Sequence, residues 1–364
     1  MEIAGSPLFL LLAGVLAGAA MGYAARRHHF CTMSALERHW YAGDSKGLRT
    51  WVLSAAVALV LTQGLALAGY IDLRQSFYLL PSFGLAGAVL GGLAFGFGMA
   101  LCGTCGFGAL TQAGGGSLRS FVVLLVMGLS ALAAQRGLVA QVRVTIVDDL
   151  ALDLSFAGDQ SLGSLASTLA GIDLRLATAG LVAMLLSWWI FREPTFRAAY
   201  GRIAAGTVIG AAIAFGWVAT TLAARYSFEP VQIEAGSFVV PVADTILHTV
   251  AFTGVWPDYG VGLVAGVVIG AAICAWHRRD ARWEACDDAR ELGRHLAGGF
   301  LMGVGGVFAM GCTIGQGVSA VSVLALSAPI VIASIFAGAR MGLAYLIEGS
   351  PLAAFRRTGP TPAE

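Results

Sequence analysis

Two cysteines, each set among glycines inside an apolar run, are the residues of this sequence best placed to do chemistry. Cys105 lies in the run GTCGFG at 103–108, and Cys312 lies in GCTIGQG at 311–317. A glycine weakens a helix by about 1 kcal/mol relative to alanine, so both runs predict helix breaks. Glycine-interrupted apolar segments in corresponding positions of two halves indicate the substrate site of a membrane transporter.

A break of this kind favours an anionic ligand. It exposes helix N-termini whose free N–H groups and dipole attract negative charge, and glycine lets a ligand approach the backbone. No Asp or Glu lies near either break in the sequence, which disfavours a cation pathway or a proton relay. We therefore predict an anion site whose neutral contacts come from these residues: Cys105, Gly106, Cys312, Thr313, Gly315 and Gln316, with Thr104 and Ser319 as further donors.

The charge of the ligand also predicts the state of the thiols. A thiolate about 4 Å from a monoanion, at an effective dielectric constant near 20, would cost roughly 4 kcal/mol, and about twice that beside a dianion. We expect each cysteine to be a neutral thiol, which is a weak donor. Weak binding suits passage, because a site that holds its ligand too firmly does not release it.

Two other classes of function fit some of the cysteines. Cys102 and Cys105 form a C-x-x-C motif, which in a redox protein exchanges disulfides, so a membrane thiol–disulfide oxidoreductase is the alternative. An unrelated small-anion channel, in which the cysteines are dispensable, is a third hypothesis. A zinc site is disfavoured because four ligands at conventional spacing are missing from the sequence. We expect no cofactor and no catalytic residue. Cys274 and Cys286, which flank a basic loop, are expected to be bystanders.

Composition predicts the elements that position these residues. Hydrophobic residues make up 57% of the 364-residue chain and charged residues 12%, whereas soluble domains carry about 25% charged residues. With a mean hydropathy of +0.79, the chain is predicted to be an all-α polytopic membrane protein. Runs of about 20 apolar residues predict nine spanning helices, at about 7–26, 49–70, 84–102, 118–136, 175–191, 203–224, 259–277, 295–311 and 322–346, with partial helices at 30–40, 105–116 and 242–255.

Basic residues predict the orientation, because loops rich in Lys and Arg stay in the cytoplasm. With nine spans, sixteen of the 22 Lys and Arg fall on one side, in the regions 26–49, 103–119, 192–202, 278–294 and 356–357. The N-terminus is then periplasmic and the C-terminus cytoplasmic, in a bacterial inner membrane. The first apolar run lacks the basic start of a secretory signal, so it is expected to be a retained helix. Net charge is +1, and no basic tract indicates nucleic acid binding.

The two halves of the sequence resemble each other. The run leading to Cys105 (GLAGAVLGGLAFGFGMA) and the run leading to Cys312 (GGFLMGVGGVFAMG) share their glycine pattern. We expect one integral membrane domain over 1–364, with a first repeat at 1–136, an external loop and linker helix at 137–197, a second repeat at 198–347 and a cytoplasmic tail at 348–364. The odd helix between two four-helix units inverts the second unit, and inverted repeats place the substrate near the midplane.

A third cysteine and its basic neighbours extend the predicted pathway. Cys31 follows Arg26, Arg27, His28 and His29 at the cytoplasmic end of the first apolar run. The His pair lies where interfacial side chains are expected, and with the arginines it is predicted to form a basic mouth for anions. Arg340 lies within the last apolar run, where a charge is costly, and a structural role is expected for it.

The three cysteine motifs resemble those of the YeeE/YedE family of sulfur transporters. The resemblance rests on RHHFCTMSA around Cys31, GFGMALCGTCGFG around Cys105 and MGCTIGQGVSA around Cys312, and it covers nearly the whole chain. It implies a permease that imports thiosulfate across the bacterial inner membrane. It also implies that Cys31, Cys105 and Cys312 line the pathway and pass on the outer sulfur through S–H···S contacts, and that a TusA-like sulfur-carrier protein is a cytoplasmic partner. Cys102 departs from the pattern, in which a small residue is expected.

Overall fold

The computed structural model describes residues 7–145, 151–155, 158–227, 230–252, 257–286 and 288–355. The chain is built almost wholly of helices: α1 Pro7–His28, α2 Thr32–Ala42, α3 Lys46–Leu67, α4 Leu85–Cys102, α5 Gly106–Gly114, α6 Leu118–Arg136, α7 Leu138–Arg143, α8 Leu162–Ala170, α9 Arg175–Phe191, α10 Pro194–Arg197, α11 Tyr200–Tyr226, α12 Val240–Val250, α13 Tyr259–Arg278, α14 Ala289–Phe308 and α15 Ser327–Glu348. Two short strands, β1 Ser82–Phe83 and β2 Leu152–Asp153, pair antiparallel. Single-turn 3₁₀ helices lie at Leu73–Gln75, Phe77–Leu79 and Pro351–Phe355, and a π-helical turn lies at Gly315–Ala320.

The predicted class, an all-α membrane protein, is confirmed. Each of the nine apolar runs contains a long helix, and α2, α5 and α12 occupy the three segments predicted to be partial helices. Among the described residues, seven helices are long and apolar enough to cross a membrane: α1, α3, α4, α6, α11, α13 and α15. The count of nine is not met on those terms, because α9 has only 17 residues and α14 carries Arg290, Glu291 and Arg294 in its first turns. The predicted tail at 348–364 lies outside the described residues from 356 onward.

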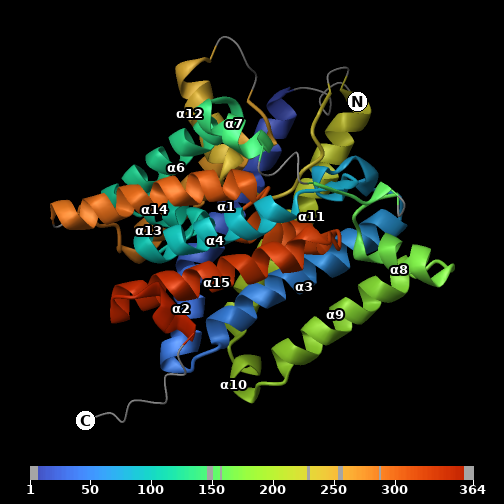
Figure 1. Cartoon of the computed structure of the whole chain (residues 1–364), viewed down its shortest axis with the longest axis horizontal. Helices are drawn as coiled ribbons and strands as arrows, with labels where there is room; N and C mark the ends of the chain where they lie inside the picture. Colours follow the sequence, from blue (N-terminus) through green and yellow to red (C-terminus); the bar gives the residue numbers. More distant parts are fainter. Residues whose placement is uncertain are drawn as a thin grey trace.

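The order of long and short helices occurs twice along the chain. The first half runs long, short, long, long, short, long through α1 to α6. The second half repeats this order through α11, α12, α13, α14, the turn at Gly315–Ala320 and α15. In the sequence, α9 comes between the two halves. In the structure it lies along the lower edge of the bundle and packs mainly on α3 (Figure 1). Its outer face exposes Leu181, Met184 and Trp188, as a lipid-facing helix would.

The main helix contacts join one half to the other. In the first half, α1 packs on α13 and α4 packs on α15. In the second half, α11 packs on α3 and α14 packs on α6. The remaining large contacts, α1 with α11 and α4 with α14, join helices that hold equivalent places in the two halves. Figure 1 shows the resulting interleaved bundle, with α14, α4, α15 and α3 side by side.

Glycine explains how α1 and α13 approach so closely. A Cβ on Gly18 would collide with the carbonyl oxygen of Leu263, and a Cβ on Gly266 would collide with that of Val15. Small residues at such contacts let membrane helices meet backbone to backbone. The glycine-rich composition is therefore used largely for helix packing.

Arg340 has the structural surroundings that a costly charge requires. Its guanidinium lies 5.6 Å from the ring centre of Trp40 and 5.0 Å from that of Tyr41, both on α2. Cation–π contacts of this kind stabilise a partly desolvated charge. The residue thus ties α15 to α2, close to the end of the bundle where α1 ends.

Candidate functional site: two thiol sites at the helix breaks

Cys31 and Cys105 lie together, although 74 positions separate them in the sequence. Cys31 is the extended residue before α2, and Cys105 is the extended residue before α5. The Cys31 thiol is within hydrogen-bonding reach of Cys105 and lies 3.9 Å from the Thr104 hydroxyl. A Cβ on Gly108 would lie 3.1 Å from the Cys31 sulfur and 3.5 Å from the Cys105 sulfur. We call these two thiols the Cys31–Cys105 site.

The local sequence explains why the chain breaks at Cys105. Gly103 ends α4 in the left-handed region, with φ of 69°, where glycine is favoured. Two residues later, the Cys105 sulfur accepts the N–H of Gly108 at 3.3 Å, as a capping side chain does at a helix start. The thiol is therefore held at the N-terminus of a helix of nine residues.

Cys312 repeats this arrangement in the second half. The chain leaves α14 through Met310, whose φ of 54° is unusual for a side-chain-bearing residue, and through Gly311. The Cys312 sulfur then accepts the N–H of Gly315 at 3.4 Å. Both cysteines thus accept from a glycine three residues further on, at the start of a short helical segment. We call the second arrangement the Cys312 site.

The sequence motifs did not indicate two residues of the Cys312 site, Tyr78 and Ser237. The Ser237 hydroxyl and the Phe238 N–H face the Cys312 thiol. A Cβ on Gly315 would lie 2.9 Å from the Ser237 oxygen and 3.0 Å from the Tyr78 oxygen. Ser237 could have been sought from the repeat, because it lies shortly before the short helix α12, near the place that Cys31 has directly before α2. Tyr78 lies on a single 3₁₀ turn between α3 and α4 and carries no signal in the sequence.

Gln316 is used to hold the second break together. Its amide nitrogen donates to the carbonyls of Ala309 at 3.0 Å and Met310 at 3.1 Å, and its amide oxygen accepts from Ser327 at 3.1 Å. The side chain is fully buried. Because its hydrogen bonds run within the protein, we assign Gln316 to positioning of the break rather than to direct contact with a ligand.

The remaining predicted residues, Gly106 and Thr313, flank the thiols. A Cβ on Gly106 would lie 3.3 Å from the Met127 sulfur, so this position has little free space. The Thr313 hydroxyl is buried and has no hydrogen-bond partner among the described residues. Such a hydroxyl is costly unless something binds it, which fits a residue that meets a ligand.

Aromatic rings connect the two thiol sites. Phe107, two residues after Cys105, stacks on Phe238, which adjoins the Cys312 site, with ring centres 4.9 Å apart and planes at 34°. Phe30 meets Phe107 edge to face at 6.1 Å. Phe107 and Phe238 are fully buried. Buried rings that contact one another therefore adjoin both thiol sites.

A small basic pocket adjoins Cys31 on the side where α1 ends. It has a volume of about 20 Å³, and its lining includes the titratable or charged side chains of His28, His29, Arg38 and Arg202, with Cys31 on its wall. Arg26 lies apart from it, in an ion pair with Asp280 at 2.9 Å. The predicted basic mouth thus has the two histidines, but its arginines come from α2 and α11.

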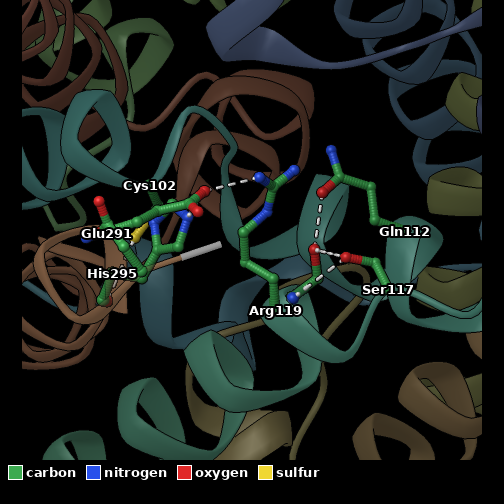
Figure 2. A network of polar contacts seen from close by, with 8 residues as sticks. Cys102, Gln112, Ser117, Arg119, Glu291 and His295 are labelled. Atoms are coloured by element: carbon green, nitrogen blue, oxygen red, sulfur yellow. Dashed lines mark hydrogen bonds and ion pairs between the residues drawn. The ribbon is translucent and has the colours of Figure 1, made fainter. Parts of the chain in front are cut away.

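Cys102 faces away from the Cys31–Cys105 site. Its thiol lies 3.5 Å from the backbone carbonyl of His295 on α14, and a Cβ on Gly298 would collide with its sulfur. Figure 2 shows it beside His295 and Glu291, with Arg119 donating to Glu291 at 2.8 Å. All six cysteines are free thiols. Of the two thiols of the C-x-x-C motif, Cys102 contacts α14 and Cys105 contacts Cys31.

No metal centre is seen in the part of the chain that the structure describes, where no three His, Cys, Asp or Glu side chains gather as ligands. The groups that the two thiol sites offer a ligand are cysteine sulfurs, hydroxyls and backbone N–H groups. Such donors, held at helix N-termini, recognise anions by hydrogen bonding.

Comparison with known proteins shows the family of the chain. The family model described as sulphur transport matches residues 27–341, so the chain belongs to this family of membrane proteins, as the cysteine motifs predicted. The chain is 26% identical over 332 residues to the thiosulfate transporter TsuA of Escherichia coli strain K12, covering 85% of this chain and 86% of that protein. It is 23% identical over 338 residues to the thiosulfate transporter TsuA of Spirochaeta thermophila, covering 87% of this chain and 93% of that protein.

Proposed function

We propose that this protein is a permease that imports thiosulfate, or a closely related sulfur-containing anion, along a pathway through Cys312, Cys105 and Cys31. The observation that carries the proposal is the pair of matching breaks, each of which holds a thiol against the N–H of a glycine. The two similar proteins are both thiosulfate transporters. They support the substrate class.

Thiosulfate suits this arrangement because it has two different ends. Its terminal sulfur accepts weak hydrogen bonds from thiols, and its oxygen atoms accept from hydroxyl and N–H groups. No covalent bond needs to form or break, so the protein acts as a transporter and not as an enzyme. Since the donors are neutral, the anion is held weakly enough to move from the Cys312 site to the Cys31–Cys105 site.

We further propose an inner-membrane location with the N-terminus periplasmic and the C-terminus cytoplasmic. Most Lys and Arg residues then face the cytoplasm, and the basic pocket beside Cys31 becomes the exit. The reciprocal contacts, α1 on α13 and α11 on α3, support two inverted repeats. A TusA-like sulfur-carrier protein is the proposed cytoplasmic acceptor, on the strength of the family resemblance.

Uptake of ³⁵S-labelled thiosulfate into proteoliposomes tests the proposal. Wild-type protein is expected to accumulate label, and Cys105→Ala and Cys312→Ala are expected to abolish uptake. Cys274→Ala is the matched control, because Cys274 is also fully buried but lies on α13, away from both breaks. Full uptake by the Cys105→Ala, Cys312→Ala double variant would rule out the cysteine pathway and favour an anion channel with dispensable cysteines.

A further inference from the structure

The hydroxyl of Tyr78 is a buried polar group that faces the Ser237 hydroxyl but makes no well-formed hydrogen bond among the described residues. The side chain is 2% exposed. Its ring is fixed by Phe77, at 3.9 Å between ring centres, and by Trp217, at 6.4 Å. Trp217 is held in turn by a hydrogen bond from its indole N–H to Ser322 at 3.0 Å. A rigid buried hydroxyl without a well-formed hydrogen bond costs free energy unless a ligand supplies an acceptor.

The Tyr78 hydroxyl points into the Cys312 site. It lies 3.0 Å from the place where a Cβ on Gly315 would be, and the Ser237 hydroxyl lies 2.9 Å from the same place. The absence of a side chain at position 315 is what leaves room for both oxygens. Two hydroxyls, the Cys312 thiol and the backbone at Gly315 therefore surround one point.

Ser237 is held in place by its own segment. The backbone of its neighbour Gly236 bonds Ser319 twice: the Gly236 N–H donates to the Ser319 hydroxyl at 3.1 Å, and that hydroxyl donates to the Gly236 carbonyl at 2.7 Å. Glu234 lies in the same segment, but its carboxylate accepts the Gly260 N–H. The hydroxyl of Ser237 is thereby presented to Cys312 by a fixed backbone.

We propose that Tyr78 and Ser237 form a subsite for the oxygen atoms of the transported anion, while the Cys312 thiol contacts its terminal sulfur. The proposal rests on the function proposed above and adds to it the groups that recognise the sulfonate end. Hydroxyls donate stronger hydrogen bonds to oxyanions than thiols do. They bring no positive charge, so the subsite selects an oxyanion without trapping it.

The two thiol sites then differ in what they recognise. Ser237 lies three residues before the short helix α12 of the second half, and Cys31 directly precedes the short helix α2 of the first half. The Cys312 site combines one thiol with two hydroxyls, whereas the Cys31–Cys105 site combines two thiols with Thr104. The Cys312 site therefore recognises the anion mainly through its oxygen atoms, and the Cys31–Cys105 site recognises it mainly through its sulfur.

The test is the KM for labelled thiosulfate in proteoliposomes for Tyr78→Phe, Ser237→Ala and Ser237→Thr. Loss of one hydroxyl donor to a charged acceptor is expected to raise KM about ten-fold or more, with Vmax changed much less. Ser237→Thr keeps a hydroxyl and is expected to remain within about two-fold of wild type by the same reasoning. Tyr345→Phe is the matched control, because Tyr345 is 46% exposed on α15.

The outcomes separate this subsite from the proposed function. If wild-type protein takes up no thiosulfate, the proposed function is wrong. If wild type transports and both Tyr78→Phe and Ser237→Ala keep the wild-type KM, the subsite is overturned and the permease stands. A structural role for the two residues would lower the amount of folded protein without raising KM, and that result also overturns the subsite. A raised KM that Ser237→Thr restores supports it.

Discussion

Phe107 stacks on Phe238, with ring centres 4.9 Å apart, at the junction of the two thiol sites. Each ring comes from a different half of the chain, and each adjoins a proposed substrate contact. We expect an anion that moves between the Cys312 site and the Cys31–Cys105 site to displace this pair. The pair is therefore the proposed constriction of the pathway.

Phe238→Ala is expected to widen that constriction and to destabilise the protein. Removing a fully buried phenylalanine costs about 3–5 kcal/mol, and Phe238 is fully buried. We expect a lower midpoint of thermal unfolding in detergent, together with leak of chloride through proteoliposomes. Phe196→Ala, at a fully buried ring in the contact of α9 with α3, is expected to destabilise without leak. Equal leak in both variants would show that loosened packing alone is responsible.

Gly108→Ala is expected to abolish uptake. The added methyl group would collide with the Thr104 hydroxyl and lie 3.1 Å from the Cys31 sulfur, in the middle of the Cys31–Cys105 site. Gly64→Ala is the control, because a Cβ there meets nothing within 4 Å and alanine favours a helix by about 1 kcal/mol. Uptake of labelled thiosulfate, normalised to folded protein, measures both, and wild-type uptake by Gly108→Ala would contradict the assigned site.

Cys102→Ala is expected to leave uptake within about two-fold of wild type, since its thiol faces α14, where it contacts the carbonyl of His295 weakly. The measurement is the same uptake assay, beside Cys105→Ala. The same variant tests the alternative function, because a thiol–disulfide oxidoreductase requires both thiols of the C-x-x-C motif. Unchanged uptake by Cys102→Ala argues against the oxidoreductase. Quinone-linked oxidation of a dithiol that disappears in Cys102→Ala would support that enzyme in place of the permease.

The stability of the protein is expected to fall as pH rises from about 5 to about 8. Burial, with the charges of Asp258 and Asp244, raises the pKa of Glu234 to about 8 from an ordinary value of 4.5. The folded state then binds more protons than the unfolded state between these values, so raising the pH favours unfolding. The midpoint of thermal unfolding in detergent should fall across this window in wild type and fall less in Glu234→Gln. Identical slopes would mean that Glu234 titrates normally.

Much of the fold could be predicted from the sequence, because twenty apolar residues in lipid have few alternatives to a helix. The three partial helices were also predictable, since their apolar runs are too short to span. The breaks at Cys105 and Cys312 followed from glycine. The number of spanning helices was harder to predict, because two helices lie close to the limits for a span. The first turns of α14 carry charged residues, and α9 is short.

The site was predicted in part. The motifs single out the three cysteines as candidates, and their role stays a prediction. The contact of Cys31 with Cys105 depends on how α2 folds back beside α5, which no local pattern specifies. Gln316 was predicted to bind substrate because a free amide suits an anion. The structure instead provides carbonyl and hydroxyl partners for it. Tyr78 could not be predicted, because its hydroxyl reaches the Cys312 site only through the space beside Gly315, a residue far away in the sequence.

The interleaving of the two halves has a consequence for biogenesis. The glycine face of α1 packs on α13, which begins at Tyr259. In the same way, α4 packs on α15, which is synthesised much later. α1 therefore crosses the membrane with its glycine face unpaired by α13 until more than two hundred further residues have been made. Neither half expressed alone can bury these faces, and assembly has to follow complete synthesis of the chain.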